Sequence, residues 1–255
     1  MLYKGDCLEI MPTLPSGSVD MVFCDLPYGT TACKWDSIIP LDKLWEQYHR
    51  IVKENGAIVL TSAQPFTTTL ISSNLPNFKY TMVFQKTYAT NWLSSKKRPL
   101  PDHEDICIFY RKQPKYNPQM VYTGVPNPGY QTGSAEHYDN EGQETSDRGG
   151  SLDRFPRTVL GPFPRAIKDI PDELKKQGHK MHPTQKKQEL VDFFIRSFTD
   201  EGDTVMDNTM GSGSTCVSAI RNNRQYIGIE MNDEYFELAE KWIEIEKNNL
   251  NQFFA

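Results

Sequence analysis

Short apolar runs alternate along the chain with segments of helical spacing, which is the pattern of an α/β protein. Seven runs predict strands, which lie near Leu2, Val19, Ala57, Tyr80, Asp105, Thr204 and Tyr226. Apolar residues spaced three and four apart predict helices over 41–53, 185–198, 214–222 and 233–249, with shorter ones over 7–11 and 65–72. Asn55-Gly56 is predicted to end the helix over 41–53, and Thr184 is the expected N-cap of the helix over 185–198.

One long segment breaks this alternation. Residues 113–180 show no helical or strand period and are frequent in Pro, Gly, Asn and aromatic residues. A structureless loop of this length is uncommon in a compact domain. We therefore interpret 113–180 as an inserted recognition element between two halves, 1–112 and 181–255, of one domain.

Composition limits the class of protein. The 255 residues are 38% hydrophobic and 24% charged, which fits a globular chain, and no apolar run reaches 18 residues. The five cysteines are scattered without a CxxC pair, which favours reduced thiols in a cytoplasmic protein. His179 and His182 are the one close histidine pair, and without a second ligand pair they predict no metal site.

Charge is segregated within the 113–180 region and its surroundings. Residues 134–147 carry five acids and no Lys or Arg, whereas residues 148–187 carry ten Lys or Arg and four acids. The net charge of −5 excludes a protein coated in positive charge. A local basic patch can still neutralise phosphates.

The first chemical motif ends the strand that begins at Val19. Asp25-Leu26-Pro27-Tyr28 follows this apolar run, and Pro27 makes the exit from the strand stiff. Asp25 then stands at the carboxyl end of a strand, where open α/β sheets bind ligands. A carboxylate that accepts from an exocyclic amine, next to an aromatic face, suits a flipped nucleobase.

The second motif is a strand, a glycine turn, a helix and a further strand that ends in an acid. Gly211 and Gly213 form the turn after Asp207, and Glu230 ends the second strand, 19 positions after Gly211. Such a unit binds a ribosylated cofactor. The third glycine of the dinucleotide fingerprint is missing, and Asp207 would repel a pyrophosphate but accept from an ammonium group. S-adenosylmethionine is the cofactor that fits.

Together these motifs resemble those of bacterial or phage DNA amino-methyltransferases whose catalytic motif precedes the cofactor motif. Asp25-Leu26-Pro27-Tyr28 is similar to the family's Asp-Pro-Pro-Tyr signature, with Leu26 replacing its first proline. Residues 207–213, Glu230, the segment 182–186 and the turn Gly5-Asp6 match the family's cofactor-binding positions. The resemblance covers roughly residues 1–112 and 180–249.

The resemblance implies a Rossmann-like, seven-stranded, mostly parallel sheet in a circularly permuted order, with the cofactor-binding half last. The implied catalytic residues are Asp25, Leu26, Pro27 and Tyr28. The implied S-adenosylmethionine site consists of Asp6, Cys7, Asp25, His182, Thr184, Gln185, Lys186, Asp207, Asn208, Thr209, Gly211, Ser212, Gly213, Ser214, Thr215, Glu230 and Met231. An acid at the first catalytic position accompanies adenine in this family, whereas serine accompanies cytosine, so the expected product is N6-methyladenine.

Basic and aromatic residues predict the contact with double-stranded DNA. The expected residues are Trp35, Asn91, Trp92, Lys96, Lys97, Arg98, Arg154, Arg157 and Arg165. The resemblance also suggests a homodimer, and a restriction endonuclease partner would be a separate chain. No membrane association is expected.

Other functions stay open at this point. The chain could methylate the N4 amine of cytosine, or it could act on RNA or on a protein glutamine through a related motif. A nicotinamide oxidoreductase is disfavoured by the missing glycine and by Asp207. A regulator with an inactive methyltransferase fold is disfavoured by the intact Asp25, Pro27 and Tyr28, and a zinc deaminase lacks its Pro-Cys-x-x-Cys motif.

Overall fold

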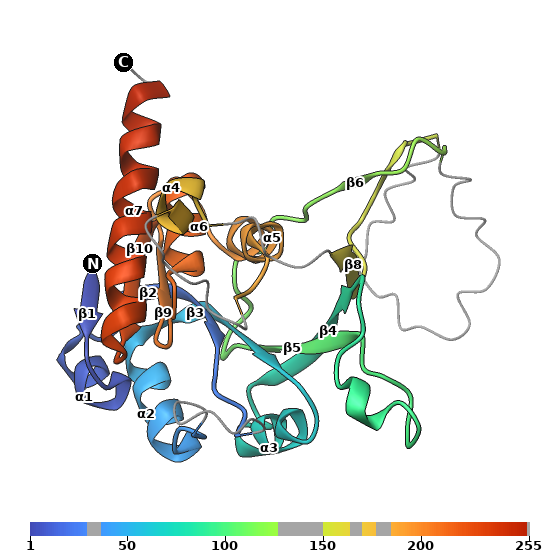
Figure 1. Ribbon diagram of the computed structural model, residues 1–255, viewed down its shortest axis with the longest axis horizontal. Helices are drawn as coiled ribbons and strands as arrows, with labels where there is room; N and C mark the ends of the chain where they lie inside the picture. The colour runs from blue at the N-terminus through green and yellow to red at the C-terminus, as the bar shows by residue number, and fades with distance from the viewer. Residues whose placement is uncertain (30–36, 127–149, 164–169, 177–184, 254–255) are drawn as a thin grey trace. The chain divides into compact units, whose positions relative to one another are not determined.

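The computed structural model describes residues 1–29, 37–126, 150–163, 170–176 and 185–253 (Figure 1). The chain forms two compact units, the first of residues 1–117 and 158–255, the second of residues 118–157. Within the described ranges, no helix has the length and apolar character needed to cross a membrane.

The first unit is built on an eight-stranded sheet. In spatial order its strands are β1 (Leu2–Lys4), β10 (Gln225–Glu230), β9 (Thr204–Asp207), β2 (Val19–Asp25), β3 (Val52–Ser62), β5 (His103–Phe109), β4 (Phe78–Lys86) and β8 (Val159–Phe163). Each strand is parallel to its neighbour except β5, which is antiparallel to both β3 and β4. The central strands are buried on both faces, which explains their continuous apolar runs.

Helices cover both faces of the sheet. On one face, α1 (Cys7–Ile10), α2 (Leu41–Ile51) and α3 (Phe66–Ser73) pack on residues such as Val22 and Leu60. On the other, α5 (Gln188–Phe198), α6 (Ser214–Arg221) and α7 (Asp233–Phe253) pack on residues such as Phe23 and Leu2. The short α4 (Asp172–Lys176) packs on α7, and two 3-10 helices are η1 (Met11–Thr13) and η2 (Trp92–Ser94).

The predicted fold class, a Rossmann-like and mostly parallel sheet, is confirmed. The count of seven strands was wrong, because β8 adds an eighth. Pro162 interrupts β8, and a proline within a sheet is largely confined to edge strands and bulges; β8 lies at the edge of the sheet. No apolar period marked this strand in the sequence.

Two predicted helix boundaries were also wrong. The helix over 41–53 ends at Ile51, and Asn55-Gly56 lies inside β3, where the register with β2 shifts. The helix expected from Gln185 begins at Gln188, with Lys187 at its N-cap position. Residues 185–187 therefore precede α5 outside the helix, and the Lys186 side chain reaches the Asp25 carboxylate at the end of β2.

The second unit contains a two-stranded antiparallel sheet of β6 (Val121–Tyr122) and β7 (Asp153–Arg154). The Arg154 guanidinium donates to the carbonyl oxygens of Ser151 and Val125, each at 2.8 Å. This unit lies within the segment 113–180 that lacked a period, whereas β8 and α4 from the same segment pack with the first unit.

Candidate active site

Polar side chains gather where the parallel strands end. The strand order reverses between β9 and β2, since β10 and β1 lie beyond β9 and β3 lies beyond β2. Asp25 ends β2 and is paired in register with Thr61, while Asp207 ends β9 and Glu230 ends β10. A reversal of this kind opens a crevice at the carboxyl ends of the strands, which is the usual ligand site of such sheets.

The Asp25 carboxylate is held by three donors. Its Oδ1 accepts from the Tyr28 hydroxyl at 2.7 Å and from the Thr61 hydroxyl. Its Oδ2 accepts from Lys186 Nζ at 2.7 Å. Because the donors come from β3, the motif itself and the segment ahead of α5, three parts of the chain fix one carboxylate.

The rest of the motif is divided between packing and chemistry. Leu26 is buried in the core, which accounts for an apolar residue at that position. The Tyr28 ring stacks on Phe66 with centroids 5.4 Å apart. Burial and the nearby Asp25 raise the pKa of Tyr28 well above its ordinary value, so the phenol stays neutral and donates.

The glycine turn brings backbone close to the space beside Glu230. Gly213 has φ +87°, and a Cβ there would lie 2.9 Å from the Cβ of Ala239. The amide of Gly211 donates to Glu230 Oε2 at 2.9 Å. The helix α6 begins directly after Gly213, so its free N–H groups face the same turn.

Asp207 is a buried carboxylate beneath this turn. It accepts from the Thr209 amide at 3.1 Å and from the Thr215 hydroxyl at 2.7 Å. Burial raises the pKa of Asp207 to about 6, although both hydrogen bonds act to lower it. The site would therefore gain from a cationic ligand group near Asp207.

Two buried amides in the predicted cofactor site have a nitrogen without a hydrogen-bond partner among the described residues. Asn208 accepts from Tyr48 at 2.5 Å, and Gln185 accepts from Ser212 at 3.1 Å, but Asn208 Nδ2 and Gln185 Nε2 are unsatisfied. Buried donors without partners are costly unless a ligand or water satisfies them. The residues present thus fit a ligand with both acceptor atoms and an ammonium group.

Other predicted cofactor residues lie at the turn after β1, directly after β10, or outside the described residues. Asp6 caps α1 by accepting from the Leu8 amide, and Gly5 donates to the Glu230 carbonyl, so this turn adjoins the end of β10. Cys7 is buried with its pKa raised by burial to about 11, and Met231 is largely exposed. His182 and Thr184 lie outside the described residues.

The cysteine next to the motif is not available as a nucleophile. Cys24 is fully buried, and its Sγ lies 2.9 Å from the Thr209 hydroxyl. Burial and the nearby Asp207 raise the pKa of Cys24 well above its ordinary value, so it stays a thiol. Cys24 is therefore a packed residue of β2.

A basic loop with exposed apolar side chains leaves the same edge of the sheet. Because β4 runs in the direction of β3, the connection from β4 to β5 starts at the edge that carries Asp25. At its tip, Asn91 has φ +62°, Trp92 is 69% exposed and Leu93 is 98% exposed. Lys96, Lys97 and Arg98 follow and are exposed. Trp35 and Arg165 lie outside the described residues.

Sequence reasoning missed Thr61, Glu104 and Lys86. Thr61 could have been found as a polar residue that ends an apolar strand, as Asp25 does. Glu104 is the second residue of β5, and the antiparallel direction of β5 places it at the edge of the sheet that carries Asp25. No spacing in the sequence reports that direction. Lys186 was assigned to the cofactor site, as was Asp25, and its Nζ lies 2.7 Å from Asp25 Oδ2 and 3.0 Å from Glu104 Oε2.

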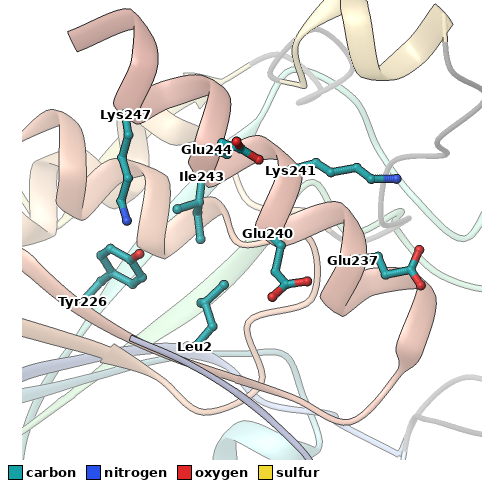
Figure 2. A pocket seen from close by; sticks show the side chains of 8 residues that line it. All are labelled: Leu2, Tyr226, Glu237, Glu240, Lys241, Ile243, Glu244 and Lys247. Atoms are coloured by element: carbon teal, nitrogen blue, oxygen red, sulfur yellow. The ribbon is translucent and has the colours of Figure 1, made fainter. Parts of the chain in front are cut away.

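A separate groove of about 520 Å³ lies beside α7 (Figure 2). It is lined by Leu2, Tyr226 and Ile243 together with acidic and lysine side chains of α7. None of the predicted site residues lines it, so it is distinct from the polar side chains gathered at the strand ends.

Known proteins resemble the chain over most of its length. YhdJ of Escherichia coli (strain K12), named a DNA adenine methyltransferase, is 27% identical over 96% of this chain and 82% of its own length. YubD of the same organism is 37% identical over 91% of this chain and 85% of its own length.

Solved structures share the fold. The PvuII DNA methyltransferase, described as cytosine-N4-specific, has a TM-score of 0.67 at 18% identity and covers 98% of this chain and 92% of its own. The complex of M1.HpyAVI with SAM has a TM-score of 0.62 at 21% identity and covers 94% of this chain and 98% of its own. The family described as DNA methylase matches residues 19–241, and the chain therefore belongs to the DNA methylase family.

Proposed function

We propose that this protein transfers a methyl group from S-adenosylmethionine to the N6 amine of an adenine flipped out of duplex DNA. The observation that carries the proposal is the Asp25 carboxylate, fixed by three donors at the point where the strand order reverses. Family membership supports DNA methylation, and the identity of the base rests on Asp25.

The cofactor assignment rests on chemistry at the ends of β9 and β10. S-adenosylmethionine, when bound, supplies a methyl group on a sulfonium. Asp207 would accept from its ammonium group and Glu230 from its ribose hydroxyls, and the turn at Gly211 and Gly213 would let the backbone come close to the cofactor. The unsatisfied nitrogens of Asn208 and Gln185 are donors for its acceptor atoms.

Asp25 acts on the target amine as a hydrogen-bond acceptor. The lone pair of an adenine amine is delocalised into the ring, so the amine is a poor nucleophile. The amine donates one hydrogen bond to Asp25 and a second to a backbone carbonyl near Leu26 or Pro27. Together these hydrogen bonds draw the nitrogen towards tetrahedral geometry. Alignment of that lone pair supplies most of the acceleration that such a transfer needs.

The choice of adenine over cytosine rests on the acid at the first motif position. A carboxylate accepts a stronger hydrogen bond from an amine than a hydroxyl does. The relative YhdJ is named for adenine, whereas the structural neighbour PvuII methyltransferase is named for cytosine N4. The product therefore has to be identified chemically, and we expect N6-methyladenine.

Arg154, Arg157 and Arg165 are proposed to contact DNA phosphates. Replacing all three with alanine should weaken binding to duplex DNA and flatten its dependence on salt, because fewer counterions are released. Arg154 also bonds to two carbonyls of its own unit, so Arg157→Ala, at an exposed position, is measured alone as well. Fluorescence anisotropy over a salt series gives both quantities.

A matched control removes three exposed lysines of the first unit, Lys4, Lys112 and Lys115, each of which pairs with an acid. This triple variant makes the same change in charge and should keep the wild-type salt slope. Equal slopes for both triple variants and the wild type would contradict the arginine contacts.

Trp92 and Leu93 are proposed to fill the space that the flipped base leaves in the duplex. Apolar side chains inserted between base steps do so in other DNA-binding proteins. The variant Trp92→Ala with Leu93→Ser should lower the single-turnover rate about 10-fold or more, since stacking is worth about 1–3 kcal/mol per base. Cofactor affinity, measured by calorimetry, should not change.

Leu75→Ser provides the control, because Leu75 is 63% exposed and precedes β4 at the opposite edge of the sheet. It should keep the wild-type rate. If the Trp92 and Leu93 variant reacted as fast as Leu75→Ser, these two side chains would not fill the space that the flipped base leaves.

The test of the function uses S-adenosylmethionine with a radiolabelled methyl group and three acceptors: unmethylated duplex DNA, total RNA and total protein. Label is expected in DNA alone. Label confined to RNA or protein would refute the substrate class. We further propose a homodimer in the cytoplasm, with any restriction endonuclease as a separate chain, and light scattering measures the mass.

A further inference from the structure

Four charged side chains of alternating sign extend inward from the catalytic carboxylate. Asp25 Oδ2 pairs with Lys186 Nζ at 2.7 Å, and Lys186 Nζ pairs with Glu104 Oε2 at 3.0 Å. Glu104 Oε1 in turn accepts from Lys86 Nζ. The four residues come from β2, the segment ahead of α5, β5 and β4, so no single element creates the chain of ion pairs.

The side chains of Lys186, Glu104 and Lys86 are largely buried. The side chains of Lys186, Lys86 and Glu104 are 6%, 11% and 15% exposed. Burial acts to raise the pKa of Glu104, but the ammonium groups of Lys186 and Lys86 outweigh it and lower that pKa to about 2. Burial acts to lower the pKa of Lys186, but Asp25 and Glu104 outweigh it and raise that pKa above its ordinary value. Buried ion pairs often add little stability, so a role beyond stability is indicated.

The arrangement of donors around the Asp25 carboxylate indicates a role in orienting its oxygens. An ionised carboxylate accepts at about four lone-pair sites. Tyr28 and Thr61 occupy two on Oδ1, and Lys186 occupies one on Oδ2. Among the donors of the described residues, none occupies the remaining site, which lies on Oδ2, the oxygen that Lys186 holds. A target amine that donates there meets an oxygen whose direction Lys186 sets.

Lys186 also lies by the second residue of the site. Its Nζ is 5.9 Å from the centroid of the Tyr28 ring, within the range of a cation–π contact. One ammonium group thus contacts the acceptor of the amine and the aromatic ring beside it.

We infer that Lys186 is a positioning residue for the catalytic carboxylate, and that Glu104 and Lys86 hold Lys186 in that position. The inference rests on the proposed function and deepens it. It also moves Lys186 from the cofactor site, to which its place in the sequence assigned it, to the site of the target base.

The test separates chemistry from binding. Three quantities are measured for the wild type, Lys186→Met, Lys186→Arg and Glu104→Gln. They are the single-turnover rate of methyl transfer to unmethylated plasmid DNA, the affinity for S-adenosylmethionine by calorimetry, and the affinity for the DNA by fluorescence anisotropy. Lys186→Met should transfer about 100-fold more slowly, because a misplacement of about 1 Å costs that much. Both affinities should stay within about threefold of wild type, and Lys186→Arg, which keeps the charge, should recover part of the rate. Glu104→Gln keeps the size of the side chain and should lose roughly tenfold.

Lys187→Met is the matched control, since Lys187 is a buried neighbour that pairs with Glu189 at 3.7 Å. It should react at the wild-type rate. A wild-type rate for Lys186→Met, or a loss of cofactor affinity that accounts for its slow rate, overturns the inference. If Lys186→Met does not fold, a wild-type rate for Glu104→Gln overturns it. Absence of transfer by the wild type itself overturns the proposed function.

Discussion

Replacing Asp25 with asparagine is expected to lower the single-turnover rate of methyl transfer about 10³-fold, which is about 4 kcal/mol of transition-state stabilisation. Asparagine fits the same space but is a weaker acceptor, and its amide nitrogen can face the target amine as a second donor. Among the described residues, Glu104 would then be the one anionic partner left to Lys186. Rapid quench of radiolabelled transfer to duplex DNA measures the rate.

The same strand offers the control. Asp20 lies at the opposite end of β2, where it pairs with Lys53 at 2.6 Å and accepts from the Thr204 amide at 3.0 Å. Asp20→Asn should keep the wild-type rate, and both variants should keep the wild-type affinity for the cofactor. A rate for Asp25→Asn within tenfold of the wild type would show that Asp25 is not the acceptor.

Binding of S-adenosylmethionine is expected to weaken as the pH falls through 6, by about tenfold at pH 5. Burial raises the pKa of Asp207 to about 6 in the free protein, and the cofactor's ammonium group favours the charged carboxylate. Below pH 6 binding must therefore expel a proton, whereas above pH 7 this carboxylate adds no further dependence. Asp207→Asn should remove this dependence and weaken binding at pH 8 by about 1.5–3 kcal/mol, or roughly 10- to 160-fold.

Calorimetry in two buffers of different ionisation enthalpy counts the protons released. The wild type should bind in the micromolar range, at about −8 kcal/mol. Asp203→Asn is the control, because Asp203 directly precedes β9 at its other end and accepts from the Asp200 amide. It should leave both the affinity and its pH dependence unchanged. Proton release that persists in Asp207→Asn would assign it to another group.

Most of the fold could be predicted because the spacing of apolar residues along the chain shows which faces of its helices and strands are buried. The strand 19–25 is a continuous apolar run broken only by Asp20, and the helix face with Leu190, Phe194 and Ile195 is buried as its spacing predicted. The period failed where burial is partial. Strand β8 has intermediate or exposed positions throughout and includes Gly161-Pro162, so its pairing with β4 left no trace in the spacing.

The candidate site could be predicted in part for a similar reason. Asp25, Asp207 and Glu230 each end an apolar strand, so the sequence places them at strand ends, and the topology brings those ends together. Glu104 is the second residue of a strand, and its position beside Lys186 depends on the direction of β5 and on the segment ahead of α5. Those are tertiary facts that no local pattern encodes.

The base that receives the methyl group tests the central claim most directly. Unmethylated plasmid DNA is incubated with S-adenosylmethionine and either wild-type protein or Asp25→Asn, digested to nucleosides, and analysed by mass spectrometry. We predict N6-methyldeoxyadenosine with the wild type and, over the same short incubation, about 10³-fold less with the variant. N4-methyldeoxycytidine as the main product would contradict the account.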